Sequence, residues 1–268
     1  MNAILLTSTF LRHQFVINYL ASCIDVIGVW QEEKSFEPQR YAQTEKDDAI
    51  IAQHFAERDA SEAMCFGEHA ELRLAPRVVR RRLPPGHIND PAEVEQMVRL
   101  APDVLLVFGT GILRESIIKS FGGKIINIHL GLSPYYRGSG TNFWPLVNRE
   151  PEYVGATIHY LDAGIDTGPI VTHIRPQIEV GDGPHDIGNK TIKAAAIMLA
   201  NVALAHAAGS LRTVKRTQRG RLYQRKDFSA NAVRQLYRNF ETGMIEEYLR
   251  DKPERDARLE MVSLERCG

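Results

Sequence analysis

Residues 102–129, PDVLLVFGTGILRESIIKSFGGKIINIH, contain two apolar runs separated by a segment of helical pattern. The runs at 103–107 and 124–129 predict short buried strands, and the segment 113–120 predicts the helix between them. A strand, a crossing helix and a second strand make up the unit from which parallel sheets are built. This stretch therefore predicts an α/β fold.

The N-terminal part of the chain shows the same alternation. AILLT at 3–7 and IDVIGVW at 24–30 predict strands that flank a helix over 11–22. An Asn-Asp-Pro cap at 89–91 begins a further helix that reaches about Leu100. Repeated units of this kind predict a Rossmann-like, mostly parallel sheet with helices on both faces.

Between these units the pattern is weaker. Residues 31–74 are rich in charge, so apart from a helix near 46–58 we expect a surface excursion there. The second half predicts a short helix at 142–149, strands at 153–161 and 169–175, and a long helix at 186–207.

The tail changes character near residue 210, which separates a catalytic domain over 1–210 from a small C-terminal extension over 211–268. The extension is first basic, at 212–226, and then helical, with an amphipathic pattern over 230–250 that could pair with a second copy in a homodimer. We expect the basic stretch to be a solvated face.

Composition excludes several classes of protein. Lys plus Arg and Asp plus Glu are 33 each, so the chain lacks the basic excess typical of nucleic-acid binding, and a nucleic-acid partner is not expected. The three cysteines form no CxxC pair, and no HExxH is present, so we predict no metal and a reducing, cytoplasmic location. The first apolar run is too short for a signal peptide or a membrane span.

Polar side chains follow one predicted strand at its carboxyl end. Because side chains alternate along a strand, Asn127 and His129 project from one face of IINIH. Open α/β sheets place their ligand crevices at the carboxyl ends of parallel strands. Further along, YLDAGIDTGPI supplies Asp162 and Asp166 in a Gly-rich turn between two strands, close enough to face the same crevice, although either could simply be a turn former. His159 lies on a predicted strand and is expected to have a core or supporting role.

Residues 127–171, NIHLGLSPYYRGSGTNFWPLVNREPEYVGATIHYLDAGIDTGPIV, resemble the folate-dependent formyltransferases, a family that includes glycinamide ribonucleotide, methionyl-tRNA and sugar-amine formyltransferases. Asn127 and His129 look like the family's Asn-x-His pair, and Asp166 looks like its catalytic aspartate. Residues 102–113 are similar to the segment that borders the folate pocket. The resemblance covers roughly residues 1–210.

The resemblance implies transfer of a formyl group from the co-substrate N10-formyltetrahydrofolate to an amine. Asn127 and a protonated His129 would donate to the oxyanion, and one such donor is worth roughly 3–4 kcal/mol. Asp166 would accept the proton of the attacking amine, and it would raise the pKa of His129.

Other residues of the site follow from the same resemblance. The co-substrate ring is expected against the backbone of a glycine-containing loop and beneath a second turn, with contacts from Phe108, Gly109, Thr110, Gly111, Leu113, Asp162, Gly164 and Ile165. The acceptor is expected at the loop after the catalytic strand, formed by Tyr135, Tyr136, Arg137 and Gly138. The planar fork of Arg137 could bind a phosphate or a carboxylate.

The acceptor itself is less constrained. The chain has Gly131-Leu132-Ser133-Pro134 where the tRNA and purine enzymes usually have Ser-Leu-Leu-Pro, and its extension is helical rather than β-rich. The loop sequence is closer to enzymes that formylate nucleotide-linked amino sugars, and the helical extension differs from the β-rich domain that the methionyl-tRNA enzymes add. We therefore expect a small-molecule amine of the sugar class. A methionyl-tRNA or glycinamide ribonucleotide acceptor, a formyltetrahydrofolate hydrolase and a non-enzymatic binding module remain alternatives.

Overall fold

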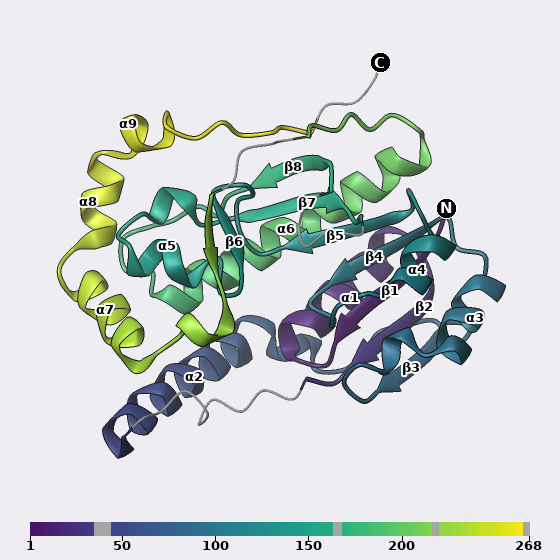
Figure 1. The fold of residues 1–268 in the computed structure, drawn as a ribbon, viewed down its shortest axis with the longest axis horizontal. Helices are drawn as coiled ribbons and strands as arrows, with labels where there is room; N and C mark the ends of the chain where they lie inside the picture. The colour runs from purple at the N-terminus through teal and green to yellow at the C-terminus, as the bar shows by residue number, and fades with distance from the viewer. Residues whose placement is uncertain (35–43, 163–167, 216–219, 265–268) are drawn as a thin grey trace.

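A seven-stranded sheet organises the described part of the chain, which is residues 1–34, 44–162, 168–215 and 220–264 of a computed structural model (Figure 1). In spatial order the strands are β3 (Val79–Leu83), β2 (Asp25–Glu32), β1 (Asn2–Ser8), β4 (Val104–Phe108), β5 (Ile125–His129), β7 (Ala156–Tyr160) and β8 (Ile170–Ile174). The first five strands are parallel to one another, whereas β7 is antiparallel to β5 and to β8. The predicted mostly parallel sheet is confirmed.

Helices cover both faces of this sheet, as predicted (Figure 1). On one face α1 (Leu11–Cys23) and α6 (Pro184–Ala207) share an apolar core with the strands, including Val16, Leu106, Ile126 and Ala196. On the other face α3 (Pro91–Arg99) and α4 (Glu115–Ser120) share a second core, including Leu6, Met97, Leu105 and Ile117. The two cores use alternate residues of the same strands, as the pleat of a buried sheet requires.

This alternation positions the polar pair on β5. Ile126 and Ile128 belong to the core beneath α1 and α6, whereas Ile125 belongs to the core on the side of α3 and α4. Asn127 and His129 therefore project on the side of α3 and α4. They do so at the carboxyl end of β5, and the strand order changes direction nearby, between β1 and β4.

The segment expected to be a surface excursion is more ordered than its sequence pattern indicates. The helix predicted near 46–58 is α2 (Glu45–Phe66), which packs against α1, α6 and α7 and is followed by the unpredicted strand β3. Thr44 caps α2 by accepting a hydrogen bond from the Asp47 backbone at 3.2 Å. The inner face of α2 includes the buried polar residues His54, Ser61 and Glu62, which hides the apolar periodicity.

The C-terminal extension packs onto the sheet domain. Strand β9 (Arg221–Tyr223) pairs with β6 (Tyr136–Gly138), and three helices follow, α7 (Ala230–Glu241), α8 (Met244–Arg250) and α9 (Lys252–Asp256). The predicted helix over 230–250 is wrong in one respect, because Gly243 has a φ of +76° and separates α7 from α8. Their apolar residues join a third core with α5 (Phe143–Val147), so this amphipathic face packs within the chain.

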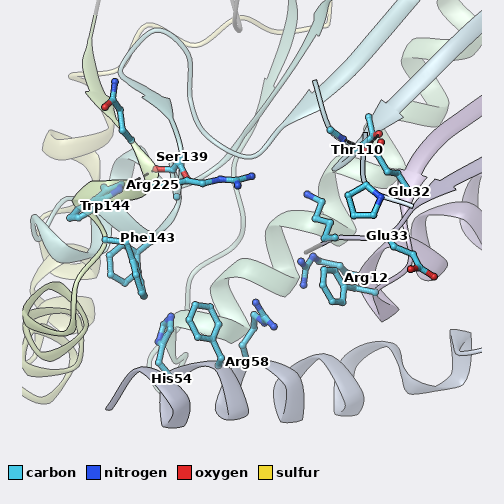
Figure 2. A pocket seen from close by; sticks show the side chains of 18 of the residues that line it. Arg12, Glu32, Glu33, His54, Arg58, Thr110, Ser139, Phe143, Trp144 and Arg225 are labelled. Atoms are coloured by element: carbon cyan, nitrogen blue, oxygen red, sulfur yellow. Dashed lines mark hydrogen bonds between the residues drawn. The ribbon is translucent and has the colours of Figure 1, made fainter. Parts of the chain in front are cut away.

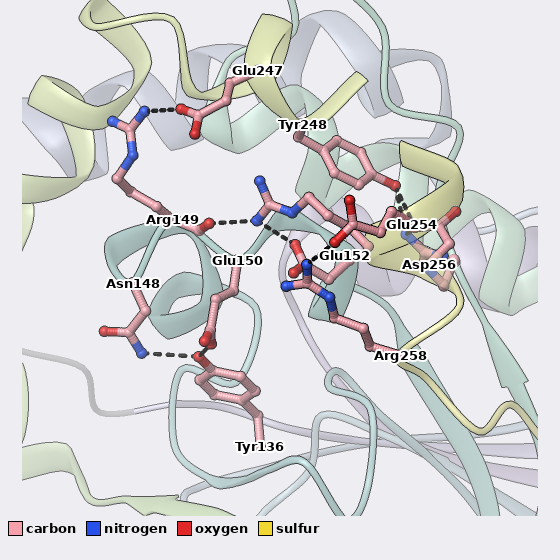
Figure 3. Close-up of polar contacts among 12 residues, drawn as sticks. Tyr136, Asn148, Arg149, Glu150, Glu152, Glu247, Tyr248, Glu254, Asp256 and Arg258 are labelled. Atoms are coloured by element: carbon pink, nitrogen blue, oxygen red, sulfur yellow. Dashed lines mark hydrogen bonds and ion pairs between the residues drawn. The ribbon is translucent and has the colours of Figure 1, made fainter. Parts of the chain in front are cut away.

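Ion pairs and hydrogen bonds hold the last part of the extension against the rest of the chain. Arg149 contacts Glu247 at 2.5 Å, as Figure 3 shows, and Arg255 contacts the buried Glu152 at 2.6 Å. His173, on edge strand β8, accepts from the Val262 backbone at its Nδ1 (3.0 Å). No helix in the described ranges is long and apolar enough to cross a membrane.

Candidate active site

A cleft lies at the carboxyl ends of β1, β2, β4 and β5. It consists of two adjoining cavities, one of about 590 Å³ that contains Asn127 and one of about 500 Å³ that contains several basic side chains. We call them the Asn127 cavity and the basic cavity. They share the wall residues Arg12, Lys34, Thr110, Gly111, Ser139, Gly140, Phe143 and Arg225.

Asn127 is held in one orientation by its neighbour on β7. The pairing of β5 with β7 sets Asn127 opposite His159, and the amide Nδ2 lies 3.1 Å from His159 Nε2. His159 Nδ1 lies 2.9 Å from the Tyr160 carbonyl, which can only accept, so Nδ1 carries the proton and Nε2 accepts from Asn127. One amide hydrogen of Asn127 therefore remains to donate to a ligand in the cavity. The predicted supporting role of His159 agrees with this contact.

His129 lines the same cavity and is 9% exposed. A glycine makes room for it, because a Cβ at residue 131 would lie 2.9 Å from His129 Nε2 and 2.5 Å from Thr141 Cβ. The Thr141 hydroxyl donates to the Leu130 carbonyl and holds this turn. The Gly131 of the sequence motif is thus required by the close approach of the loop to the imidazole.

The glycine-containing loop after β4 forms a second wall of the Asn127 cavity. All five residues predicted there, Phe108, Gly109, Thr110, Gly111 and Leu113, line the cavity, as does Asp162. Gly109 has a φ of +74°, and a Cβ there would lie 2.3 Å from Nε2 of His13. Burial, with a smaller effect from Arg12, holds the pKa of His13 well below its usual range, so this ring is neutral.

Three predicted residues fall in the segment of sequence between β7 and β8. Gly164, Ile165 and the catalytic candidate Asp166 lie outside the described residues. Asp162, the last described residue before them, borders the cavity that holds Asn127 and His129. Among the described residues, no group of three or more His, Cys, Asp or Glu side chains is placed to hold a metal ion.

The basic cavity is lined by four cationic side chains, Arg12, Lys34, Arg58 and Arg225 (Figure 2). Arg12 pairs with Glu62 and Arg58 pairs with Asp59, whereas no described carboxylate lies within ion-pair distance of Lys34 or Arg225. Aromatic rings complete the walls: Phe10, Phe55, Phe143, Trp144 and Phe228.

Lys34 shows how strongly positive this cavity is. Desolvation, followed by the nearby charges of Arg12 and Arg225, lowers the pKa of Lys34 to about 8. Arg12 has Glu62 as an ion-pair partner, and Lys34 is attracted by Glu32, but the cations of this cavity still repel one another. A bound anion would relieve that repulsion.

A family model described as formyl transferase matches residues 25–203, well over half of the chain. The chain belongs to the formyl transferase family. The methionyl-tRNA formyltransferase of Geobacter sulfurreducens is 38% identical over 100 residues, which cover 37% of this chain and 31% of that relative. The chain thus spans about a third of the length of this curated relative.

Solved structures show that this formyl transferase shares its fold with others. A 4-N formyltransferase from Francisella tularensis superposes with a TM-score of 0.53 at 19% identity, over 85% of this chain and 77% of that one. A formyltransferase from Anoxybacillus kamchatkensis, solved with UDP-4,6-dideoxy-4-formamido-L-AltNAc and tetrahydrofolate, gives 0.50 at 17% identity, over 85% and 87%.

The four loop residues predicted to bind the acceptor do not all line the cleft of this formyl transferase. Gly138 lines the Asn127 cavity, whereas Tyr135, Tyr136 and Arg137 are not among the residues that line the cleft. Tyr136 is 2% exposed, and its hydroxyl donates to Glu150 (Figure 3). The Tyr135 hydroxyl accepts from the Glu260 backbone at 2.7 Å. Both tyrosines therefore make contacts that hold the C-terminal extension or its neighbours, and their role as acceptor ligands stays a prediction.

Sequence reasoning missed the basic cavity and the buried carboxylate of Glu32 beside it. The cations come from four separate places in the sequence, so no local motif connects them. Lys34 and Arg58 lie in the charge-rich segment 31–74, expected to be a surface excursion. Arg225 lies in the basic stretch 212–226, expected to be a solvated face, and it lines both cavities.

Proposed function

We propose that this formyl transferase transfers the formyl group of N10-formyltetrahydrofolate to a primary amine. The observation that carries the proposal is the Asn127 amide, which His159 orients beside His129 in a cavity with a glycine-containing wall. A hydrolase of the same folate could use the same groups, with water in place of the amine. The free thiols of Cys23 and Cys65 are consistent with a reducing compartment, and we place the reaction in the cytoplasm.

Formyl transfer needs hydrogen-bond donors for the oxyanion and a base for the amine proton. As the amine nitrogen attacks the formyl carbon, a C–N bond forms and the formyl oxygen becomes an oxyanion. The remaining amide hydrogen of Asn127 and the imidazole of His129 would donate to that oxygen, each worth roughly 3–4 kcal/mol in a preorganised site. The intermediate then expels N10 of tetrahydrofolate, which takes up a proton, while the amine nitrogen loses one to a base. By resemblance this base is Asp166.

The glycine-containing wall suits the flat ring of the folate. Glycine lets this loop pack closely on its neighbours, because a Cβ at residue 109 would meet His13 and a Cβ at residue 111 would meet Glu32. In this proposal the flat ring lies against the backbone of the loop. Leu113 adds apolar surface, and Ile112 is 79% exposed at the rim of the cavity. These residues would hold the folate with its N10 directed to Asn127 and His129.

For the acceptor, we propose the amino group of a nucleotide-linked sugar. The basic cavity adjoins the Asn127 cavity and shares Arg12, Lys34 and Arg225 with it, so a diphosphate bound there would lie next to the reacting centre. Its aromatic walls could stack on a base. A cavity of about 500 Å³ is of a size to take a nucleotide, whereas a tRNA would need an extended basic face. The complex of the Anoxybacillus formyltransferase with a UDP-linked formamido sugar supports this choice.

A mass-spectrometric screen tests the proposal. The purified protein is incubated with N10-formyltetrahydrofolate and separate amines: nucleotide-linked amino sugars, glycinamide ribonucleotide and methionyl-tRNA. A mass gain equal to replacement of H by CHO on a sugar amine is the expected result. A gain only on the tRNA or the purine precursor would overturn the acceptor class and retain formyl transfer. Fast release of formate without any amine would show a hydrolase instead.

A further inference from the structure

Glu32 is a buried carboxylate on the wall where the two cavities meet. It is the last residue of β2, it is 3% exposed, and it lines the basic cavity next to Thr110 and Gly111. Within the described ranges no Lys, Arg or His side chain forms an ion pair with it, although Lys34 is near enough to interact with its charge. Its direct contacts are hydrogen bonds.

The two carboxylate oxygens bind two different loops. Oε1 accepts from the backbone N–H of Gly86 at 2.7 Å, with Ile88 N more distant at 3.4 Å. Oε2 accepts from the backbone N–H of Gly111 at 2.7 Å and from the Thr110 hydroxyl at 3.3 Å. One side chain thus ties the loop before α3 to the glycine-containing loop after β4.

Glu93 is a second buried carboxylate, and its charge is compensated differently. Glu93 is also buried, at 6% exposure, but it pairs with Arg81 and accepts from Trp30 Nε1 at 2.7 Å, and it does not line the cleft. Burying an unpaired carboxylate is costly unless several donors compensate it. At Glu32 the two closest donors are the main-chain N–H groups of Gly86 and Gly111, which line the basic cavity.

Gly111 and Glu32 require each other. A Cβ at residue 111 would lie 2.5 Å from Glu32 Oε2, so only glycine allows the backbone N–H to approach the carboxylate this closely. An amide at residue 32 would replace one acceptor oxygen by an NH₂ group that faces N–H donors, and one of the two loops would lose its partner.

We propose that Glu32 is a positioning residue that fixes the Thr110–Gly111 backbone at the spacing needed for the folate ring. This inference rests on the proposed function, because it assigns the glycine-containing wall to the folate. Glu32 acts through Gly111 and does not touch the reacting atoms.

The test compares Glu32→Gln with the matched control Glu93→Gln. Calorimetry gives the Kd for tetrahydrofolate, thermal unfolding gives stability, and hydrogen exchange follows the peptides over 85–89 and 109–113. We expect Glu32→Gln to raise the tetrahydrofolate Kd by about tenfold or more and to speed exchange in both peptides. Glu93→Gln should lower stability and leave the Kd within about twofold. Gly111→Ala tests the same contact from the other side if Glu32→Gln does not fold.

The outcomes separate this inference from the proposed function. If the unsubstituted protein binds tetrahydrofolate and Glu32→Gln lowers stability with an unchanged Kd, Glu32 is only structural and the inference fails alone. If Glu32→Gln weakens binding of UDP and leaves tetrahydrofolate unaffected, the residue serves the acceptor and the inference also fails. If the unsubstituted protein does not bind tetrahydrofolate, both the proposed function and the inference about Glu32 are wrong.

Discussion

Lys34 provides a test of the basic cavity that does not depend on catalysis. Its ammonium faces Arg12 and Arg225, with the carboxylate of Glu32 also nearby, and desolvation with the two arginines lowers its pKa to about 8. The arginines stay charged throughout the neutral and mildly alkaline range, so Lys34 is the cation of this cavity that titrates there. We therefore predict that binding of a nucleoside diphosphate weakens between pH 7 and pH 9.

The size of the effect follows from the pKa of Lys34. With a value of about 8, roughly nine in ten molecules carry the charge at pH 7 and about one in ten at pH 9. If only the charged form binds the diphosphate, the Kd rises about tenfold over this interval. The direction of this pH dependence follows from linkage. A bound anion raises the pKa of Lys34, so binding takes up a proton and is favoured at the lower pH.

Titration calorimetry with UDP at several pH values measures this dependence directly. The matched control is Lys34→Arg, which keeps the positive charge at every pH of the series and should give a nearly flat profile. Lys34→Met should bind weakly at every pH. If Lys34→Arg loses affinity over the same interval as the unsubstituted protein, another group titrates and the reasoning is wrong.

Three further predictions concern other parts of the molecule. Asn127→Ala should lower kcat by about 10²–10³ with little change in tetrahydrofolate affinity; a loss confined to KM would contradict its role as an oxyanion donor. Gly109→Ala places a Cβ 2.3 Å from His13 Nε2 at a positive φ, which costs at least about 1–2 kcal/mol; an unchanged melting temperature together with unchanged folate affinity would disprove this. Arg255→Met leaves the buried Glu152, whose side chain is 3% exposed, without its partner and should lower the free energy of unfolding in urea by about 3–5 kcal/mol; a loss below about 1 kcal/mol would show that the pair contributes little.

The parts of the fold that the sequence predicts are those fixed by local pattern. Strands β1, β2, β4 and β5 are short apolar runs, and helical segments of the right length separate most of them, so the parallel sheet follows from periodicity alone. The same period of two places Asn127 and His129 on one face, and the structure brings both to one cavity. These inferences need no knowledge of distant contacts.

The missed features depend on contacts between segments far apart in the chain. Strand β3 has the sequence VRRRL, whose exposed arginines give no apolar alternation because β3 is an edge strand that pairs only with β2. The charges of Arg12, Lys34 and Arg225 come together only in the folded chain, where the start of α1, the end of β2 and the extension meet at one cleft. Glu32 likewise looks like a strand-end surface carboxylate until the backbone donors of two loops are placed around it.

The boundary near residue 210 marks a change in composition, and the contacts across it argue for one functional unit. Arg225 belongs to the extension and yet lines both cavities, together with Gln224 and Phe228 in the basic cavity. Strand β9 reaches this position by pairing with β6, which follows directly on the loop after the Asn-x-His strand. Because the extension supplies one of the two cleft cations that lack a described carboxylate partner, a chain cut at residue 210 would lose both a wall and a charge of the cleft. We therefore predict that the extension contributes to acceptor specificity in this formyl transferase, whereas the candidate oxyanion donors Asn127 and His129 lie on β5.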